Sequence, residues 1–495
     1  MKGPRALLAA ALLLTAGSAH AQASYRSAPI GGRSALMGGT GVALARDGSA
    51  PFLNPATILH IDDSGVAFSV NFFASQWTTL SGFHQPGGAE ASRRGAPSLP
   101  GTDLQSSRLD PLPSTLCLFL TLGNWGDNLT GSDPEPGHRK GRRKLAACLG
   151  TLERQVFSAS GVYQGSSGGL SATQATSVAR SWNRLYVGPT YSVYVSDRVA
   201  LGASLHGVWT TSSSTWGVDT FVRPASGPSG ASFYDTSMNA SSIDLAAMLG
   251  LVWHLDDARV LGLSVSTPTA HLSGSYSGTA ALQSQGGTFG SSTLVTSTGG
   301  FQAPAPVRVA VGIGEELRTL RVEADAGAYL PLTYLARADL QTQQVGTAGL
   351  GPGRAGTSTL QIDGQPIVDA ALGVEYFLSR GVSLLGGASL DFSALRPLPA
   401  TLPPGALAES RMQRVGASFG LGSYGDGNEL LLGTELSYAW GRSAAFDAFA
   451  QTPGLTLVDQ RSYGVMVVIA GGVSLTAVRR TIRDLGSVVK LPEVK

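Results

Sequence analysis

Between Leu320 and Leu330, apolar and polar residues alternate without interruption. Successive side chains of a β-strand point to opposite faces, so this segment is expected to form a strand with two unlike faces. One face carries Arg321, Glu323 and Asp325. The other face carries only apolar side chains, namely Leu320, Val322, Ala324, Ala326, Ala328 and Leu330. Such a strand belongs in a wall that separates an aqueous space from an apolar one.

The same alternation recurs along the chain, for example over 243–254, 307–314 and 414–421. We expect about fourteen strands, at 64–75, 114–122, 145–160, 183–196, 198–211, 242–255, 258–275, 304–314, 319–333, 366–378, 381–394, 411–424, 428–442 and 461–475. A set of lipid-facing strands must close on itself, because an open edge would leave backbone groups unpaired in lipid. The predicted fold class is therefore an all-β, transmembrane, antiparallel β-barrel.

The connections between these strands are of two kinds. Short ones are expected at 196–197, 255–258, 315–318, 378–381 and 425–427. Long segments rich in Gly, Ser and Pro lie at 76–112, 211–241, 276–303 and 334–365, and we interpret them as extracellular loops. Short periplasmic turns opposite long extracellular loops are typical of outer-membrane barrels. An even number of strands then places both termini in the periplasm.

The two ends of the chain predict export and a tail. Lys2 and Arg5 precede an apolar run over 6–17, and Ala19-His20-Ala21 fits signal-peptide cleavage. The expected organisation has four parts: a signal peptide (1–21), an N-terminal hatch (22–63), the barrel (64–475) and a periplasmic tail (476–495).

Charged residues make up only 14% of the chain, which argues against an ordinary soluble domain. The formal net charge of +2 does not favour nucleic-acid binding.

Three smaller features leave alternatives open. Cys117 and Cys148 are the only cysteines, and in an oxidising compartment they either form a disulfide or remain free. A basic run at 138–144 is either a solvated loop or a contact for anionic lipid headgroups. Four tryptophans near expected strand ends fit either the headgroup zone or ordinary packing: Trp182, Trp209, Trp253 and Trp440.

The segment before the first strand does not alternate. It is rich in glycine, which permits close backbone packing and positive φ, and Asn54-Pro55 favours a turn. Its notable residues are Gly32, Arg33, Ser34, Gly38, Gly39, Gly41, Asp47, Asn54, Pro55 and Ala56. This pattern resembles the N-terminal hatch of the FadL-like outer-membrane transporters of long-chain fatty acids and aromatic hydrocarbons. The chain departs from that pattern at Ser34, where alanine is usual, and in continuing past its last strand.

The resemblance implies a fourteen-stranded barrel plugged by a hatch, and uptake of a hydrophobic compound such as a fatty acid or hydrocarbon. The ligand would be captured by loop aromatics, enter an apolar pocket above the hatch, and leave when the hatch shifts, with passage sideways through the wall as one route. The expected capture residues are Phe73, Trp77, Phe83, Phe221 and Phe233. Similar hatch motifs occur in PorV-like barrels of secretion machinery. The alternative is therefore a barrel that transports nothing and acts as a scaffold or secretion partner, with the tail contacting a periplasmic protein.

The charges on the expected lumen face are the remaining site candidates. Folding the hairpin about Glu316 and Leu317 brings Arg308 near Asp325. These charges either pair for stability, or position the hatch or a ligand carboxylate. The candidates are Arg308, Arg321, Glu323, Asp325 and Arg414.

No enzymatic constellation is expected. The GxSxG-like stretch at 165–169 lacks the strand–turn–helix context that an active serine requires. His206 and His254 fall on expected lumen faces, where we interpret them as polar lining. We expect no cofactor and no metal site, and we expect outer-membrane lipid and a hydrophobic ligand as partners.

Overall fold

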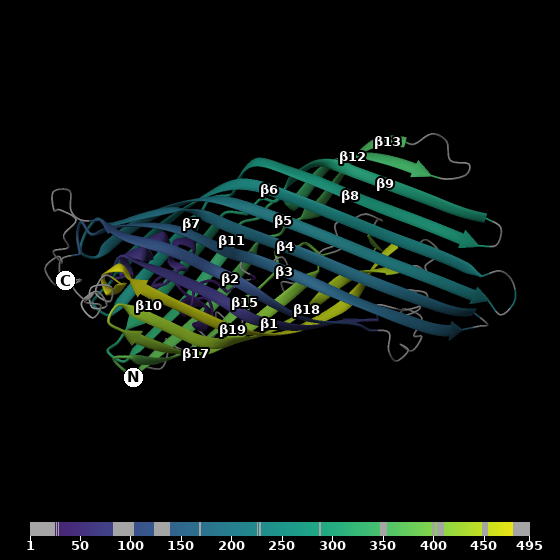
Figure 1. The fold of residues 1–495 in the computed structure, drawn as a ribbon. Coiled ribbons are helices and arrows are strands. Elements are labelled where there is room, and N and C mark those ends of the chain that lie inside the picture. Colours follow the sequence, from purple (N-terminus) through teal and green to yellow (C-terminus); the bar gives the residue numbers. More distant parts are fainter. Residues whose placement is uncertain are drawn as a thin grey trace, which may run out of the picture.

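The computed structural model is a tall barrel of antiparallel strands (Figure 1). It describes residues 25, 27, 29–82, 103–122, 139–167, 170–224, 226, 229–286, 289–346, 354–397, 401–402, 410–447 and 454–478. The predicted signal peptide and most of the predicted tail lie outside the described residues. Among the described residues, no helix combines the length and the apolar character needed to cross a membrane.

Fourteen strands form a closed ring, which confirms the predicted fold class and strand number. In ring order they are β1 (Gly65–Ser81), β2 (Leu104–Leu122), β3 (Arg143–Ser167), β4 (Leu170–Tyr194), β5 (Val199–Pro224), β6 (Gly230–His254), β7 (Arg259–Ser266), β10 (Arg308–Glu316), β11 (Leu320–Tyr329), β14 (Ile367–Ser379), β15 (Val382–Asp391), β17 (Arg411–Gly425), β18 (Asn428–Asp447) and β19 (Gly454–Ser474). Pairing of β1 with β19 closes the ring, from Gly65↔Ser474 to Ser81↔Asp459. The five short connections expected from the sequence, at 196–197, 255–258, 315–318, 378–381 and 425–427, lie together at one end.

The predicted long loops are largely strands, so that part of the prediction is wrong. The segment 211–241 continues β5 and β6, which pair as far as Val222↔Gly230. Four further strands extend the wall beyond β7, β10, β11 and β14: β8 (Ala270–Gly286), β9 (Phe289–Gln302), β12 (Tyr334–Gly346) and β13 (Arg354–Asp363). A two-residue strand, β16 (Thr401–Leu402), pairs with β19. In the extension of β5 and β6 the outer face is polar, with Thr215 and Asp219 exposed, whereas Trp216, Val218 and Tyr234 are buried on the inner face.

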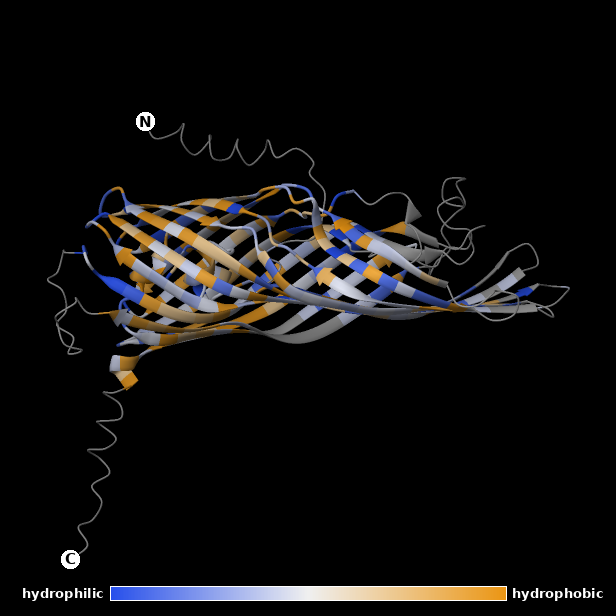
Figure 2. Ribbon diagram, turned by 90° about the horizontal axis from the view of Figure 1, so that it is seen from above, coloured by the Kyte–Doolittle hydropathy of each residue, from blue (hydrophilic) through white to orange (hydrophobic). Residues whose placement is uncertain are grey.

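The outer face of the ring is apolar where the alternation predicts it (Figure 2). Leu249, Ile313 and Leu372 are all exposed on this face, at 61%, 51% and 48%. Trp209, Trp253 and Trp440 are also exposed there, in keeping with a headgroup position. Trp182 differs, because its Nε1 donates to Glu153 Oε2 at 2.9 Å.

The N-terminal segment, residues 29–63, lies inside the ring near the end with the short turns (Figure 1). It contains two single-turn helices, α2 (Arg33–Leu36) and α3 (Ala50–Leu53), and a 3₁₀ helix, η1 (Pro55–His60). The α2 helix packs against β15, β17, β18 and β19, while η1 packs against β3, β4, β5 and β6. The segment therefore bridges opposite sides of the barrel and fills its cross-section.

The seam between β2 and β3 is paired over only part of its length. The ladder runs from Leu122↔Arg143 to Thr115↔Gly150, and the described residues above that point form no further β2–β3 ladder pair. Cys117 and Cys148 lie directly opposite each other in this ladder and are joined by a disulfide. Just above the ladder, Leu152 is an extra residue in β3, because Thr151 pairs with Leu185 and Glu153 with Arg184. Such a bulge bends its strand, and here β3 parts from β2.

Candidate binding site above the N-terminal segment

Two carboxylates of β11 hold the N-terminal segment by its backbone. Asp325 Oδ2 accepts from the amides of Gly41 and Val42, at 2.8 and 3.0 Å. Glu323 Oε1 accepts from the amides of Ala43 and Leu44, at 2.6 and 3.0 Å. Four consecutive N–H groups thus bind two buried side chains that lie on one face of one strand. The sequence left two interpretations of these charges, namely ion pairing for stability, or positioning of the hatch or of a ligand carboxylate. The contacts of Glu323 and Asp325 match positioning of the hatch.

Asp47 and Asn54 organise the segment itself. Asp47 Oδ2 accepts from the amides of Arg33 and Ser34 at 2.7 and 3.2 Å, and Oδ1 accepts from the amide of Ser49 at 2.9 Å. The Asn54 Nδ2 group donates to Val42 O at 2.7 Å inside the segment. It also donates to Leu251 O of β6 at 3.0 Å. Asn54 is fully buried, so these bonds have no competition from water.

The remaining residues of the hatch motif lie where the backbone of the segment is packed most tightly. Asn54 Oδ1 accepts from the amide of Ala56 at 3.1 Å, and Pro55 O accepts from the Ser192 hydroxyl at 2.6 Å. The φ angles of Gly38, Gly39 and Gly41 are 70°, 87° and 151°. A Cβ on Gly32 would lie 2.1 Å from Ala470 Cβ, and one on Gly38 would lie 2.6 Å from the backbone of Ala388. Glycine is therefore required where the segment touches the wall.

Arg33 joins α2 to the wall through two acidic residues. Its guanidinium reaches Glu375 Oε2 at 3.1 Å and Glu429 Oε1 at 3.3 Å, and it lies over the Tyr424 ring. Glu375 also accepts from Arg321 Nη1 at 3.2 Å. Arg33 and Arg321, two of the predicted arginines, therefore both contact the buried carboxylate of Glu375.

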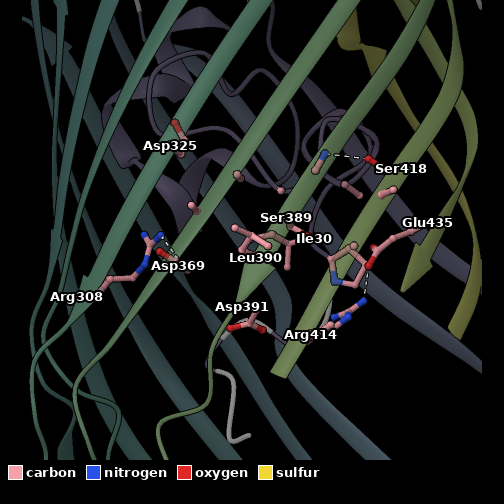
Figure 3. A pocket seen from close by; sticks show the side chains of 18 residues that line it. Ile30, Arg308, Asp325, Asp369, Ser389, Leu390, Asp391, Arg414, Ser418 and Glu435 are labelled. Atoms are coloured by element: carbon pink, nitrogen blue, oxygen red, sulfur yellow. Dashed lines mark hydrogen bonds and ion pairs between the residues drawn. The ribbon is translucent and has the colours of Figure 1, made fainter. Parts of the chain in front are cut away.

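A charged pocket lies between the segment and the wall (Figure 3). Its charged lining residues are Arg308, Asp325, Asp369, Asp391, Arg414 and Glu435. Arg308 Nη2 contacts Asp369 Oδ2 at 3.2 Å, and Arg414 contacts Glu435 and donates to Ser27 O at 2.8 Å. Each predicted arginine of the lumen thus already contacts a protein carboxylate.

The Arg308–Asp369 pair spans an intervening strand. Arg308 is on β10 and Asp369 on β14, and β11 runs between them. The two side chains meet over Gly327, where an added Cβ would lie 2.0 Å from Asp369 Oδ1 and 2.8 Å from Arg308 Nη2. The hairpin argument brought Arg308 to the correct face, and both Arg308 and Asp325 line the charged pocket.

A second, aromatic pocket lies beside α3. Its apolar and aromatic lining residues are Tyr25, Phe52, Leu152, Tyr186, Ala246, Met248 and Tyr329. Tyr25 stacks on Tyr329 with ring centroids 4.8 Å apart, and Phe52 stacks on His206 at 5.2 Å. A concave, mainly apolar pocket with few polar groups is suited to a small hydrophobic ligand.

The buried ion pair between Arg184 and Glu153, at the edge of this pocket, was not predicted from the sequence. Arg184 Nη1 contacts Glu153 Oε1 at 2.6 Å, and its other nitrogens donate to Thr210 Oγ1 at 3.1 Å and to Ala303 O at 2.9 Å. Arg184 therefore links β4, β5 and the connection before β10. The alternation that identified Arg321 could have placed Arg184 on the lumen face, but not its partners.

Several predicted capture and loop residues lie elsewhere. Phe221 and Phe233 are on β5 and β6 rather than in a loop, with ring centroids 5.5 Å apart. Trp77 is exposed on the outer face. Phe83 lies outside the described residues, as does the side chain of Phe73. Lys144, expected in a solvated run, is buried in β3 and its ammonium donates to Ile61 O and Asp63 O, so it ties down the end of the segment.

His60 predicts a pH dependence of the segment. Burial, together with nearby Arg46, lowers the pKa of His60 well below 6.5. A released segment would have the ordinary pKa of about 6.5. Binding of the segment inside the barrel is therefore strongest above pH 6.5. As the pH falls below 6.5, the equilibrium constant for this binding decreases by up to about tenfold per pH unit for one proton.

The measurement is the rate of thiol labelling of Ile58→Cys, a fully buried position, at pH 7.5 and 5.5. Rates are normalised to the same cysteine in denatured protein. We expect faster labelling at pH 5.5, and loss of that acceleration in the His60→Phe background. Equal acceleration in both backgrounds would show that another group is responsible.

Comparison with solved structures identifies the architecture. The "CymD monoaromatic hydrocarbon channel" matches with a TM-score of 0.52 and 15% identity, over 90% of this chain and 97% of that chain. The Pseudomonas putida toluene transporter TodX matches with a TM-score of 0.51 and 16% identity, over 90% and 98%. A Pseudomonas aeruginosa FadL homologue matches with a TM-score of 0.50 and 15% identity, over 92% and 100%.

The chain has a FadL-like fold. No protein-family model and no curated protein matches the sequence. At such low identity the likeness concerns the fold, and the hatch motif supplies a resemblance at the level of residues. In this FadL-like barrel the contacts of the N-terminal segment and the two pockets above it are therefore the basis for assigning a function.

Proposed function

We propose that the protein is an outer-membrane channel for the uptake of hydrophobic small molecules, with the N-terminal segment as its hatch. The aromatic pocket carries this proposal, because it places a mainly apolar lining directly against the segment. Burial of apolar surface is the driving force that retains such a ligand. The structural neighbours named for toluene and hydrocarbon transport support the same class of cargo. The end with the short turns would face the periplasm.

We further propose that the ligand leaves sideways between β2 and β3. Leu152 and Glu153 line the aromatic pocket and lie at the bulge of β3, where the β2–β3 ladder ends. The ladder ends seven residues above Leu122, which corresponds to roughly 18 Å of height for a strand tilted by about 40°. This is in the upper part of an apolar band of about 25 Å. A hydrophobic molecule would then enter the membrane without crossing the charged contacts of the hatch.

Mass spectrometry of organic extracts tests the proposed cargo. We expect a fatty acid or hydrocarbon to be enriched in detergent-purified protein over a mock purification. Ala246→Phe fills the aromatic pocket and is expected to abolish the enrichment. Ala371→Phe, which fills the charged pocket instead, is the matched control and is expected to retain it. Extracts that contain only detergent and bulk phospholipid would contradict uptake and favour a scaffold role.

A further inference from the structure

The outer face of β1, β18 and β19 carries an aromatic row made of Trp77, Tyr438, Trp440 and Tyr463. Tyr463 pairs with both Trp77 and Tyr438 across the neighbouring strands. The Tyr438 and Tyr463 ring centroids are 4.9 Å apart, and Trp440 stacks on Tyr438 at 5.4 Å. Trp77 and Tyr463 are 49% and 55% exposed, so the row faces away from the lumen.

The row lies at the edge of the apolar band. On β18 the exposed outward leucines from the short-turn end are Leu430, Leu432 and Leu436, and Trp440 lies beyond them on the same face. The ten residue steps from Leu430 to Trp440 span about 34 Å along the strand, or roughly 25 Å of height at a tilt of about 40°. That height matches the apolar band of outer-membrane barrels, whose boundaries carry aromatic side chains. The row therefore marks the boundary far from the short turns.

An arginine cluster follows directly beyond the row. It consists of Arg411, Arg442 and Arg461, on β17, β18 and β19. Arg442 pairs with Arg411 on one side and with Asp459 on the other, and Arg461 pairs with Trp440. Among the side chains that the structure describes, Asp459 is the one carboxylate in an ion pair with this patch, at 3.6 Å from Arg442, and both side chains of that pair are exposed, at 66% and 74%.

The cluster is local. At the matching height on the other flank of the barrel, the outward positions of β5 and β6 are Thr211, Ser213, Asn239 and Ser241, which carry no charge. A basic rim that served only solubility would not need to concentrate on three adjacent strands. Because it adjoins an aromatic row at the membrane boundary, the cluster faces the headgroups of one leaflet.

We propose that the arginine cluster and the aromatic row together bind a phosphorylated lipid of the outer leaflet. Guanidinium groups bind phosphate oxygens in bidentate geometry, and the aromatic rings cover the adjoining apolar part of the lipid. The choice of leaflet rests on the proposed orientation, with the short turns in the periplasm. Lipid binding itself does not depend on the cargo of the channel. The site is on the outside of the wall, whereas both pockets lie inside it.

Native mass spectrometry of the full chain in detergent tests the site with bisphosphorylated lipid A as the probe. The triple variant Arg411→Gln, Arg442→Gln, Arg461→Gln removes the cluster. A basic residue near a charged lipid surface contributes about fivefold to binding, so we expect an affinity loss on the order of 100-fold. The matched control is Arg198→Gln, Arg259→Gln, Arg380→Gln, which removes three exposed arginines at the short-turn end.

Three outcomes would overturn the proposal: unchanged binding by the cluster variant, equal losses in both triple variants, or equal binding of dephosphorylated lipid A. Displacement of lipid A by inorganic phosphate at comparable concentration would assign the site to free phosphate and also overturn it. Replacement of the three arginines by lysine, which retains charge, guards against misfolding and is expected to keep most of the binding. If the parent protein binds lipid A but its organic extract contains no enriched hydrophobic compound, only the proposed uptake function is contradicted.

Discussion

Replacement of both Glu323 and Asp325 by alanine is expected to release the N-terminal segment from its seat. Each carboxylate accepts two backbone N–H groups, so four consecutive buried donors, from Gly41 to Leu44, lose their partners. A buried donor left unpaired costs about 1–3 kcal/mol, which gives a total of roughly 4–12 kcal/mol. The lower end of that range already shifts the equilibrium toward the released state by more than about 500-fold relative to the parent protein.

The release can be measured by maleimide labelling of Ala35→Cys. Ala35 lies in α2 at 2% exposure, so its thiol is protected while the segment is seated. We expect labelling to accelerate by at least two orders of magnitude in the double variant, and single-channel conductance to rise in planar bilayers. The variant Glu323→Gln, Asp325→Asn retains acceptor oxygens and should give an intermediate rate.

Glu315→Ala is the control on the same hairpin, because Glu315 contacts only the exposed Arg259 in an ion pair of 3.6 Å. It is expected to leave the labelling rate unchanged. If the double alanine variant labels as slowly as the parent protein, then Arg33, Asp47 and Asn54 hold the segment without β11. In that case the contacts of Arg33 with Glu375 and Glu429 would be the ones that hold the segment in place.

The strands that cross the apolar band were predictable because one of their faces must be apolar. The segment 411–424 was expected and Arg411–Gly425 is observed, since Gly and Asp residues mark the short turn that follows. The segment 211–241 was missed for a related physical reason. Beyond the band the outer face of β5 and β6 is polar, with Thr215 and Asp219 exposed, and the apolar side chains Trp216 and Val218 are buried on the inner face instead. The lipid-facing pattern that identifies a strand therefore ends while the backbone ladder continues.

The candidate site was predictable in its residues but not in its partners. The alternation placed Arg308, Glu323 and Asp325 on the lumen face, and the structure places them there. Their partners come from distant parts of the chain: Gly41 is 284 residues from Asp325. Spacing within a hairpin indicates only neighbours in the same ladder, so it could not show that Arg308 reaches Asp369 over Gly327.

The bulge of β3 could not be recognised from the sequence, because Leu152 is an ordinary strand residue. Its effect depends on register: Thr151 and Glu153 pair with consecutive residues of β4, and Leu152 has no partner there. The β2–β3 ladder ends just below it, at Thr115↔Gly150. A strand pattern read in isolation identifies β2 and β3, but it does not show where they separate.

Deletion of Leu152 is therefore expected to close the proposed exit. Removal of the extra residue leaves every other side chain of β3 on its present face and allows the β2–β3 ladder to continue upward. Passage would then require broken backbone hydrogen bonds, each worth about 4–6 kcal/mol in an apolar medium, whereas about 1.4 kcal/mol already corresponds to tenfold. Uptake of a labelled fatty acid or aromatic hydrocarbon by cells should fall by at least about tenfold.

Leu152→Ala is the matched control, because it removes the same side chain from the aromatic pocket and leaves the bulge in place. Its uptake should stay close to that of the parent protein, while its bound ligand is retained less tightly. A deletion variant that still contains extracted ligand but no longer delivers it would locate the defect at the exit rather than at the pocket. Full uptake by the deletion variant would instead mean that the ligand passes through the hatch, whose lock on Glu323 and Asp325 would then control transport.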